Sequence, residues 1–192
     1  FQAHDSYFVV AHLHYVLIGG VVFPFYAGLD YWIPKMTGRM MSERLGKVNF
    51  WTMFVFFNIA FFPQHIAGML GMPRRVYTYP AGLGWDVYNL ISTVGAIGFG
   101  TGALLLVVNL LWSRKHGERA GPNPWGADTL EWWEDSPPPA AQFKFIPFVR
   151  SRHPLWEQSS LAPATREEAR QLDALRSRPT GWRAARGVSV ID

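Results

Sequence analysis

The sequence contains no cysteine. Disulfide bonds, thiolate metal sites and cysteine nucleophiles are therefore excluded, and cysteine usage carries no information about the redox compartment. The chain also lacks a glycine-rich phosphate-binding loop, an internal repeat and a nucleic-acid-binding motif. These absences remove thiol enzymes, nucleotide-binding P-loop proteins and nucleic-acid-binding proteins from the candidates.

Charged residues are missing from three long stretches of the chain. No Asp, Glu, Lys or Arg occurs at positions 6–29, 48–73 or 87–113, which are windows of 24, 26 and 27 residues. A helix of about 20 residues crosses a hydrocarbon core of roughly 30 Å, whereas the apolar part of a secretory signal is only about 7–15 residues long. The windows are continuously apolar rather than alternating, which indicates helices and not barrel strands.

We therefore predict an all-α fold, a polytopic transmembrane helix bundle with spans at about 6–29, 45–70 and 85–112 within a membrane region at 1–114. Pro24 and Pro63 are expected to kink their helices, because each removes one backbone donor. Gly98 and Gly102 have the spacing that lets two membrane helices approach closely.

Composition changes abruptly at Lys115, and residues 115–192 form a polar tail rich in proline and arginine. We expect this tail to be partly disordered, with one short amphipathic helix at about 165–178. Thr165 and Glu168 make a capping box there, and Pro179 ends the pattern.

Basic residues favour one side of the membrane. With three spans, the 30–44 loop and the tail share a side that carries seven cations near the membrane, and the 71–86 loop lies opposite with two, Arg74 and Arg75. The positive-inside rule places the tail in the cytoplasm, or in the matrix if the protein is mitochondrial. It also explains the net charge of +4 without a nucleic-acid partner.

Two histidines, His12 and His14, occur within the first span. Histidine in a membrane is costly unless it faces a cavity or a ligand. Residues two apart point about 200° from each other on a helix, so the pair cannot chelate one metal. It is suited instead to two planar cofactors on opposite sides of the helix, each taking one axial nitrogen. The alternative is a hydrogen bond to a neighbouring helix.

Four polar residues gather at the opposite end of the spans from the tail. His4 and Asp5 suit a hard divalent cation, although Asp5 could equally stabilise the helix start through the helix dipole. Arg74 and Arg75 fall on the same side, where arginine forks could bind the carboxylates of a haem. The alternative is an ordinary extramembrane loop.

The segment His4-Asp5-Ser6-Tyr7-Phe8-Val9-Val10-Ala11-His12-Leu13-His14-Tyr15-Val16 resembles the tenth-helix signature of haem-copper oxidase subunit I. The resemblance continues through Pro63-Gln64-His65, Gly71-Met72-Pro73-Arg74-Arg75, Asn123-Pro124-Trp125-Gly126-Ala127 and Leu130-Glu131-Trp132, and covers about residues 1–140. It implies a C-terminal fragment with helices ten to twelve of a twelve-helix subunit.

The resemblance also implies roles for single residues. His12 would be the axial ligand of the high-spin haem that reduces oxygen, and His14 an axial ligand of the low-spin haem. His4 and Asp5 would bind magnesium or manganese, and Arg74 and Arg75 would pair with haem propionates. The haems would be haem A. The copper ligands would lie upstream, so the fragment alone is not expected to be active.

Two departures from the family pattern matter. Leu13 stands where phenylalanine is common, which puts in doubt an aromatic path for electrons between the haems. Ser6 stands where threonine is usual, a change that keeps the hydroxyl.

The resemblance implies a terminal oxidase that takes electrons from cytochrome c, reduces oxygen to water and pumps protons. Its partners would be cytochrome c, oxidase subunits II and III, the N-terminal part of subunit I and the lipid bilayer. The resemblance favours the bacterial plasma membrane over the mitochondrial inner membrane as its location. A quinol oxidase is the alternative within the family, against which Asp5 and Pro73 argue. A membrane electron carrier with b-type haem and a structural subunit without cofactor are the alternatives outside it.

Overall fold

The computed structural model describes residues 3–140, 149 and 151–157. In chain order its elements are α1 (Tyr7–Leu17), the π-helix η1 (Ile18–Val22), α2 (Phe23–Thr37), α3 (Glu43–Met69), α4 (Asp86–His116), the 3₁₀ turn η2 (Leu130–Trp132) and α5 (Pro154–Glu157). The described part contains no β-strand, only two isolated bridges. The all-α prediction is therefore confirmed. The helix expected at 165–178 lies outside the described residues.

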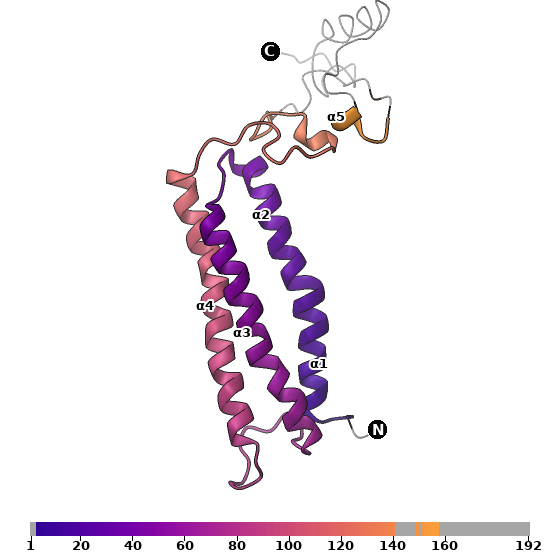
Figure 1. The fold of residues 1–192 in the computed structure, drawn as a ribbon, viewed down its shortest axis with the longest axis vertical. Coiled ribbons are helices and arrows are strands. Elements are labelled where there is room, and N and C mark those ends of the chain that lie inside the picture. The colour runs from indigo at the N-terminus through magenta and orange to yellow at the C-terminus, as the bar shows by residue number, and fades with distance from the viewer. Residues whose placement is uncertain (1–2, 141–148, 150, 158–192) are drawn as a thin grey trace, which may run out of the picture. The chain divides into compact units, whose positions relative to one another are not determined.

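Three helical segments are long and apolar enough to cross a membrane (Figure 1): Tyr7–Thr37, Glu43–Met69 and Asp86–His116. The first continues past position 29, where the sequence predicted its end, and the third reaches beyond 112. Asp30 and Lys35 do not stop the first helix, since charge alone does not break helical hydrogen bonding. Basic residues at the end of α4, Arg114, Lys115 and His116, favour its extension by complementing the helix dipole.

The first span contains a wide turn. Phe23 N–H donates to Ile18 O, five residues back, and the π-helix Ile18–Val22 directly precedes Pro24. Proline has no N–H to continue the ladder, and π turns recur where a helix accommodates such a defect. The irregularity predicted from Pro24 therefore takes the form of a π turn between α1 and α2.

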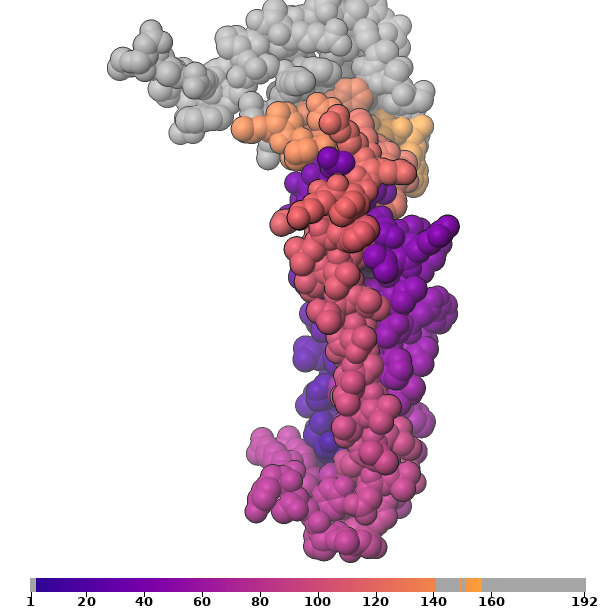
Figure 2. Space-filling view, turned by 90° about the vertical axis from the view of Figure 1, so that its left-hand side faces the viewer, coloured from indigo at the N-terminus to yellow at the C-terminus, as the bar shows by residue number. Residues whose placement is uncertain are grey.

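Helices α3 and α4 pack tightly along their length (Figures 1 and 2). A Cβ atom placed on Gly95 would lie 2.2 Å from Ala60 N, and one on Gly98 would lie 2.2 Å from the Phe56 ring. A Cβ on Gly102 would approach the Met53 side chain to 2.6 Å. Only glycine allows these approaches, and α3 and α4 use all three of them to meet.

Buried amides join the same two helices. Asn49 donates to Gly102 O at 2.6 Å. Asn109 accepts from Ser42 N–H at 3.0 Å and donates to Ser42 O at 3.1 Å, and Ser113 donates to Asn109 Oδ1 at 3.1 Å. Such interhelical hydrogen bonds hold membrane helices together where lipid gives no hydrophobic driving force.

The described chain divides into two compact units, and the second consists of residues 33–40 and the chain from 118 onward. Within it, Ala120 N–H donates to Gly38 O and Met40 N–H to Glu118 O, both at 2.9 Å. The buried ammonium of Lys35 donates to Glu134 O at 2.6 Å and Pro122 O at 3.0 Å, and lies 5.2 Å from the centre of the Trp132 ring. These bonds satisfy a buried charge that would otherwise be costly.

Candidate functional site

The candidate site begins where the chain enters α1. Ser6 is the N-cap, and its hydroxyl accepts from Phe8 N–H at 3.3 Å. The same residue pairs with Pro73 in an antiparallel bridge, flanked by Tyr7 N–H to Met72 O at 2.8 Å. The start of α1 is thereby fixed to the 72–74 segment that follows α3.

Asp5 and Arg74 meet at this junction. Arg74 N–H donates to Asp5 O at 3.0 Å, and the Arg74 guanidinium forms an ion pair with the Asp5 carboxylate. His4 Nε2 lies 3.1 Å from the same carboxylate. The helix cap is Ser6, so Asp5 is not needed for that purpose and its carboxylate joins a histidine to an arginine.

Two residues of this junction have left-handed backbone conformations, Asp5 with φ 56° and Arg75 with φ 66°. Aspartate tolerates this region, but it is unfavourable for a long side chain such as arginine. Strain of this kind persists where the surrounding structure holds it and often marks functional positions. The exposed side chain of Arg75 has no ion pair with the residues that the structure describes.

His14 lies against α3. Its Nδ1 is 2.6 Å from Val10 O, and its ring stacks on Phe61 with centroids 4.3 Å apart and planes 14° apart. A hydrogen bond from Nδ1–H to a backbone carbonyl fixes the tautomer in which Nε2 carries a free lone pair. Bonds of this type orient histidines that ligate metals.

His12 points elsewhere. Its side chain is exposed, like that of Leu13 between the two histidines, which is 55% exposed. The His12 imidazole has no hydrogen bond to any residue in the described ranges. The two rings therefore have different surroundings, one held against α3 and one on an open side of α1.

His65 is a residue whose surroundings the sequence did not predict. Its ring lies edge-on to Phe8 and Tyr15 of α1, at centroid distances of 4.9 and 5.3 Å. Tyr15 in turn donates to Asn58 Oδ1 at 2.8 Å. The sequence signal that could have predicted an aromatic contact surface for this ring is the spacing of Phe8 and Tyr15, which are seven residues apart and therefore lie on one face of a helix.

Three buried polar atoms near the junction have no hydrogen-bond partner within the described residues: Gln64 Oε1, His65 Nδ1 and Arg74 Nε. Buried polar groups are normally paired, so unpaired ones invite explanation by a group from elsewhere. The imidazoles of His12 and His14 and the guanidinium of Arg74 fit a haem with carboxylate side chains. For a divalent cation, His4 and Asp5 fit as two ligands of an incomplete set, because the described ranges hold no group of three or more His, Asp or Glu side chains arranged for a metal.

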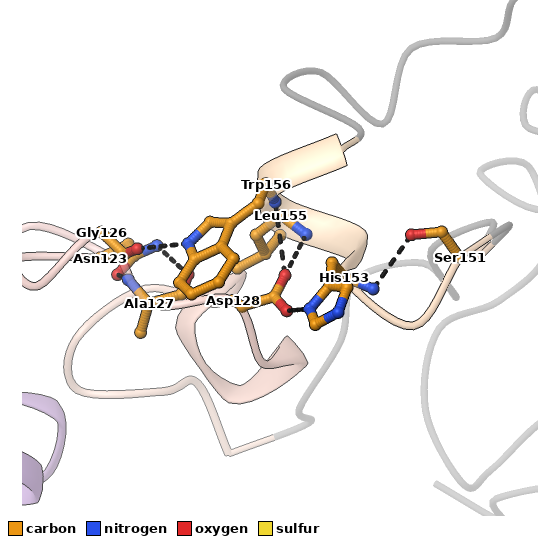
Figure 3. A network of polar contacts seen from close by, with 8 residues as sticks. All are labelled: Asn123, Gly126, Ala127, Asp128, Ser151, His153, Leu155 and Trp156. Atoms are coloured by element: carbon orange, nitrogen blue, oxygen red, sulfur yellow. Dashed lines mark hydrogen bonds and ion pairs between the residues drawn. The ribbon is translucent and has the colours of Figure 1, made fainter.

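The second unit has a separate polar cluster (Figure 3). Asp128 accepts from the backbone N–H groups of Leu155 at 3.2 Å and Trp156 at 3.4 Å, and lies 2.5 Å from His153 Nδ1. Trp156 Nε1 donates to Gly126 O at 2.7 Å. These contacts attach α5 to the 126–128 loop, which is a structural role.

Residues 1–98 match the family model described as cytochrome c and quinol oxidase polypeptide I. The chain is 47% identical to cytochrome c oxidase subunit 1 of Bacillus subtilis (strain 168), over 90% of this chain and 28% of the relative. It is 49% identical to cytochrome c oxidase subunit 1 of Bacillus sp. (strain PS3), over 81% of this chain and 26% of the relative.

The similarity extends to a second type of oxidase. The chain is 40% identical to quinol oxidase subunit 1 of Bacillus subtilis (strain 168), over 98% of this chain and 30% of the relative. In each case the chain spans less than a third of the curated relative's length.

Proposed function

The chain belongs to the haem-copper oxidase subunit I family, and from this premise we propose that it forms the haem-ligating part of a proton-pumping cytochrome c oxidase. The supporting observation is the contrast between the two imidazoles of α1. His14 is fixed against α3 with Nε2 free, and His12 is exposed two residues away. A single helix can then serve two haems, which is the arrangement that an oxygen-reducing haem and an electron-donating haem require.

The His14 ring is held in one orientation by its neighbours. The Val10 carbonyl holds Nδ1 at 2.6 Å and Phe61 restricts rotation of the ring. A ligand nitrogen held in this way binds iron with little further loss of side-chain conformational entropy. In our proposal His14 binds the low-spin haem, and His12, on the open side of α1, binds the high-spin haem.

Haems held by His12 and His14, together with copper, would supply electron transfer and oxygen reduction. The residues described here bind, orient and electrostatically stabilise those groups. Arg74 and Arg75 present guanidinium groups at the end of the bundle where haem propionates would emerge. Arg74 is already oriented by Asp5, which leaves its buried Nε to donate to a propionate.

A magnesium or manganese ion is proposed at His4 and Asp5. These two side chains lie 3.1 Å apart and supply one nitrogen and one carboxylate. The remaining ligands would come from oxidase subunit II. A cation there would share the Asp5 carboxylate with Arg74, so the metal and the propionate-binding arginine would be coupled through one side chain.

Cytochrome c is the proposed electron donor, and a quinol is the alternative. Asp5 supports the first choice through the family resemblance, in which quinol-oxidising members more often carry asparagine after the first histidine. The proposed topology places the tail in the cytoplasm, because the basic residues Lys35, Arg39, Arg44 and Lys47 are on that side.

Haem extraction from the purified complex tests the proposal. Haem A supports the oxidase, haem B alone supports a membrane electron carrier, and no haem supports a structural subunit. Oxygen consumption by the same complex is then measured with reduced cytochrome c and with a quinol. We expect oxygen consumption with reduced cytochrome c and none with the quinol. Oxygen consumption with the quinol and none with cytochrome c would show that the donor is a quinol, and the haem-binding role would still hold.

A further inference from the structure

His153 is a titratable side chain of the second unit that the proposed oxidase chemistry does not use. Its Nδ1 lies 2.5 Å from Asp128 Oδ2, and Asp128 is the one charged group in contact with the ring among the residues that the structure describes. The His153 side chain is 52% exposed, whereas that of Asp128 is only 13% exposed. Solvent can therefore protonate the imidazole, while the carboxylate opposite it is largely shielded from salt screening.

The loop that carries Asp128 is fixed by its own hydrogen bonds. Asn123 Oδ1 accepts from Ala127 N–H at 2.8 Å, and Asn123 Nδ2 donates to Ala127 O at 2.7 Å. Gly126 has a φ of 60°, a left-handed conformation that glycine adopts without strain, and it turns the chain between Asn123 and Ala127. Since the loop is held in this way, a change in the contacts of Asp128 should alter the attached segment more than the loop.

The attached segment is α5, which is a single helical turn. Isolated helices shorter than about 12–15 residues are marginal in water, so four residues need contacts from outside. Asp128 Oδ1 accepts from the backbone N–H groups of Leu155 and Trp156 at 3.2 and 3.4 Å, and Trp156 Nε1 donates to Gly126 O at 2.7 Å (Figure 3). The start of α5 is therefore held by the same carboxylate that faces His153.

Two neighbours attract the charged form of the His153 ring more strongly than the neutral form. The Asp128 carboxylate forms an ion pair with an imidazolium and only a hydrogen bond with a neutral imidazole. The Trp156 ring lies parallel to the imidazole, with planes 9° apart and centroids 5.8 Å apart, near the limit of about 6 Å for cation–π attraction. Asp128 is therefore the main partner and Trp156 a minor one.

The charge on His153 depends on pH in the physiological range. Histidine is the side chain that ordinarily changes charge between about pH 5 and 8. In the neutral ring Nδ1 keeps the hydrogen donated to Asp128, so Nε2 is the nitrogen that takes up a proton from solvent. As the pH rises, that proton leaves and the ion-pair attraction is lost, although the Nδ1 hydrogen bond can remain. Arg152, the adjacent cation, is exposed and has no ion pair within the described ranges.

We propose that the His153–Asp128 pair makes the attachment of α5 sensitive to pH: protonation of His153 holds α5 more firmly to the 126–128 loop, and deprotonation loosens it. The proposal concerns contacts within the second unit and does not depend on the haem or cation sites. With the tail on the cytoplasmic side, the pair responds to cytoplasmic pH, a consequence that rests on the proposed topology.

The test is hydrogen–deuterium exchange of the purified oxidase complex, measured by mass spectrometry on the peptide that contains Leu155 and Trp156. Exchange is followed at pH 6 and pH 8, and each rate is corrected for the intrinsic pH dependence of amide exchange. His153→Gln keeps an N–H donor but cannot become charged, and His153→Arg is charged at both pH values. His116→Gln, which removes an exposed histidine at the end of α4, is the matched control.

We expect the parent peptide to be protected about two- to fivefold more at pH 6 than at pH 8, the range expected for a partly exposed ion pair. His153→Gln should show the parent's pH 8 protection at both pH values, and His153→Arg should show the parent's pH 6 protection at both. His116→Gln should behave as the parent does.

Four results would overturn the proposal. These are equal protection of the parent at the two pH values, a pH dependence that persists in His153→Gln, loss of the pH dependence in His116→Gln, and His153→Arg protection at pH 8 no greater than that of the parent. If His153→Gln releases α5 altogether and shows no protection at either pH, the comparison of His153→Arg with the parent at pH 8 decides.

Discussion

The two sides of α3 are built differently. On the side of α4, Gly95 allows backbone contact, and Gly98 and Gly102 make room for neighbouring side chains. The buried amides of Asn49 and Asn109 are hydrogen-bonded there. On the side of α1, Gly68 makes one close approach to Phe8, and the buried Gln64 Oε1 and His65 Nδ1 have no partner in the described ranges. Most polar groups of the α3–α4 interface are paired, although the buried Ser92 hydroxyl of α4 has no partner within the described residues. On the α1 side, the two unpaired atoms require partners that the residues described by the structure do not supply.

The largest effect is expected where α3 and α4 approach most closely. Gly95→Leu would place a side chain where the Cβ position is already 2.2 Å from Ala60 N. Backbone cannot give way as a flexible side chain can, so we expect destabilisation of more than about 3 kcal/mol and loss of assembled complex. Assembly is measured by size-exclusion chromatography of the complex in detergent. Gly100→Leu, with open space around its Cβ position, is the control and should assemble normally.

The next effect is at the single close approach of α1 to α3. A Cβ atom on Gly68 would lie 2.1 Å from Phe8 N, so Gly68→Ala is expected to move α1 away at a cost of about 1–3 kcal/mol. The same substitution at Gly46, where no atom lies within 4 Å, should be neutral or stabilise the helix by up to about 1 kcal/mol. Thermal unfolding of the two variants gives the comparison. A Gly68→Ala complex as stable as Gly46→Ala would show that α1 does not depend on this contact.

A smaller effect is expected from the polar part of the α3–α4 interface. Asn109→Leu removes the two hydrogen bonds to Ser42 and the acceptor of Ser113. Interhelical hydrogen bonds in membranes contribute about 0.6 kcal/mol on average and about 1.7 kcal/mol at most, so the melting temperature should fall modestly with haem content unchanged. A loss of haem in this variant would mean that the two sides of α3 are not independent.

The smallest stability effect is expected on the α1 side, at the Asp5–Arg74 ion pair. Arg74→Gln breaks the ion pair with Asp5, but the Asp5 side chain is 56% exposed, and solvent screening limits the loss to under about 1 kcal/mol. Manganese binding at His4 and Asp5, followed by electron paramagnetic resonance, should nevertheless change, because Arg74 no longer competes for the carboxylate. An unaltered manganese signal in Arg74→Gln would show that Arg74 and the metal ion do not compete for the Asp5 carboxylate.

The sequence was sufficient to predict the three spans, because an uncharged window of that length has no other stable environment than lipid. It could not predict that the first helix continues to Thr37. The structure shows that Lys35 near that end is satisfied by the Glu134 and Pro122 carbonyls, about a hundred residues away in the chain. Contacts at such a separation leave no local pattern in the sequence.

The candidate site was predictable in its residue types and only partly in its contacts. Spacing on a helix separates His12 from His14, and chain topology brings Arg74 to the same end as Asp5. The direct Asp5–Arg74 ion pair and the left-handed backbone at Arg75 depend on the pairing of Ser6 with Pro73. The contacts of His65 were not predicted, because a single histidine near a helix end has no periodic partner and its neighbours Phe8 and Tyr15 come from α1.

The central claim is that α1 offers one imidazole to each of two haems. The most direct test is the optical spectrum of the intact oxidase complex carrying His12→Ala or His14→Ala. The account predicts that His12→Ala removes the high-spin haem signal and keeps the low-spin signal, and that His14→Ala does the reverse. Loss of both signals, or of neither, in complexes that still assemble would contradict it.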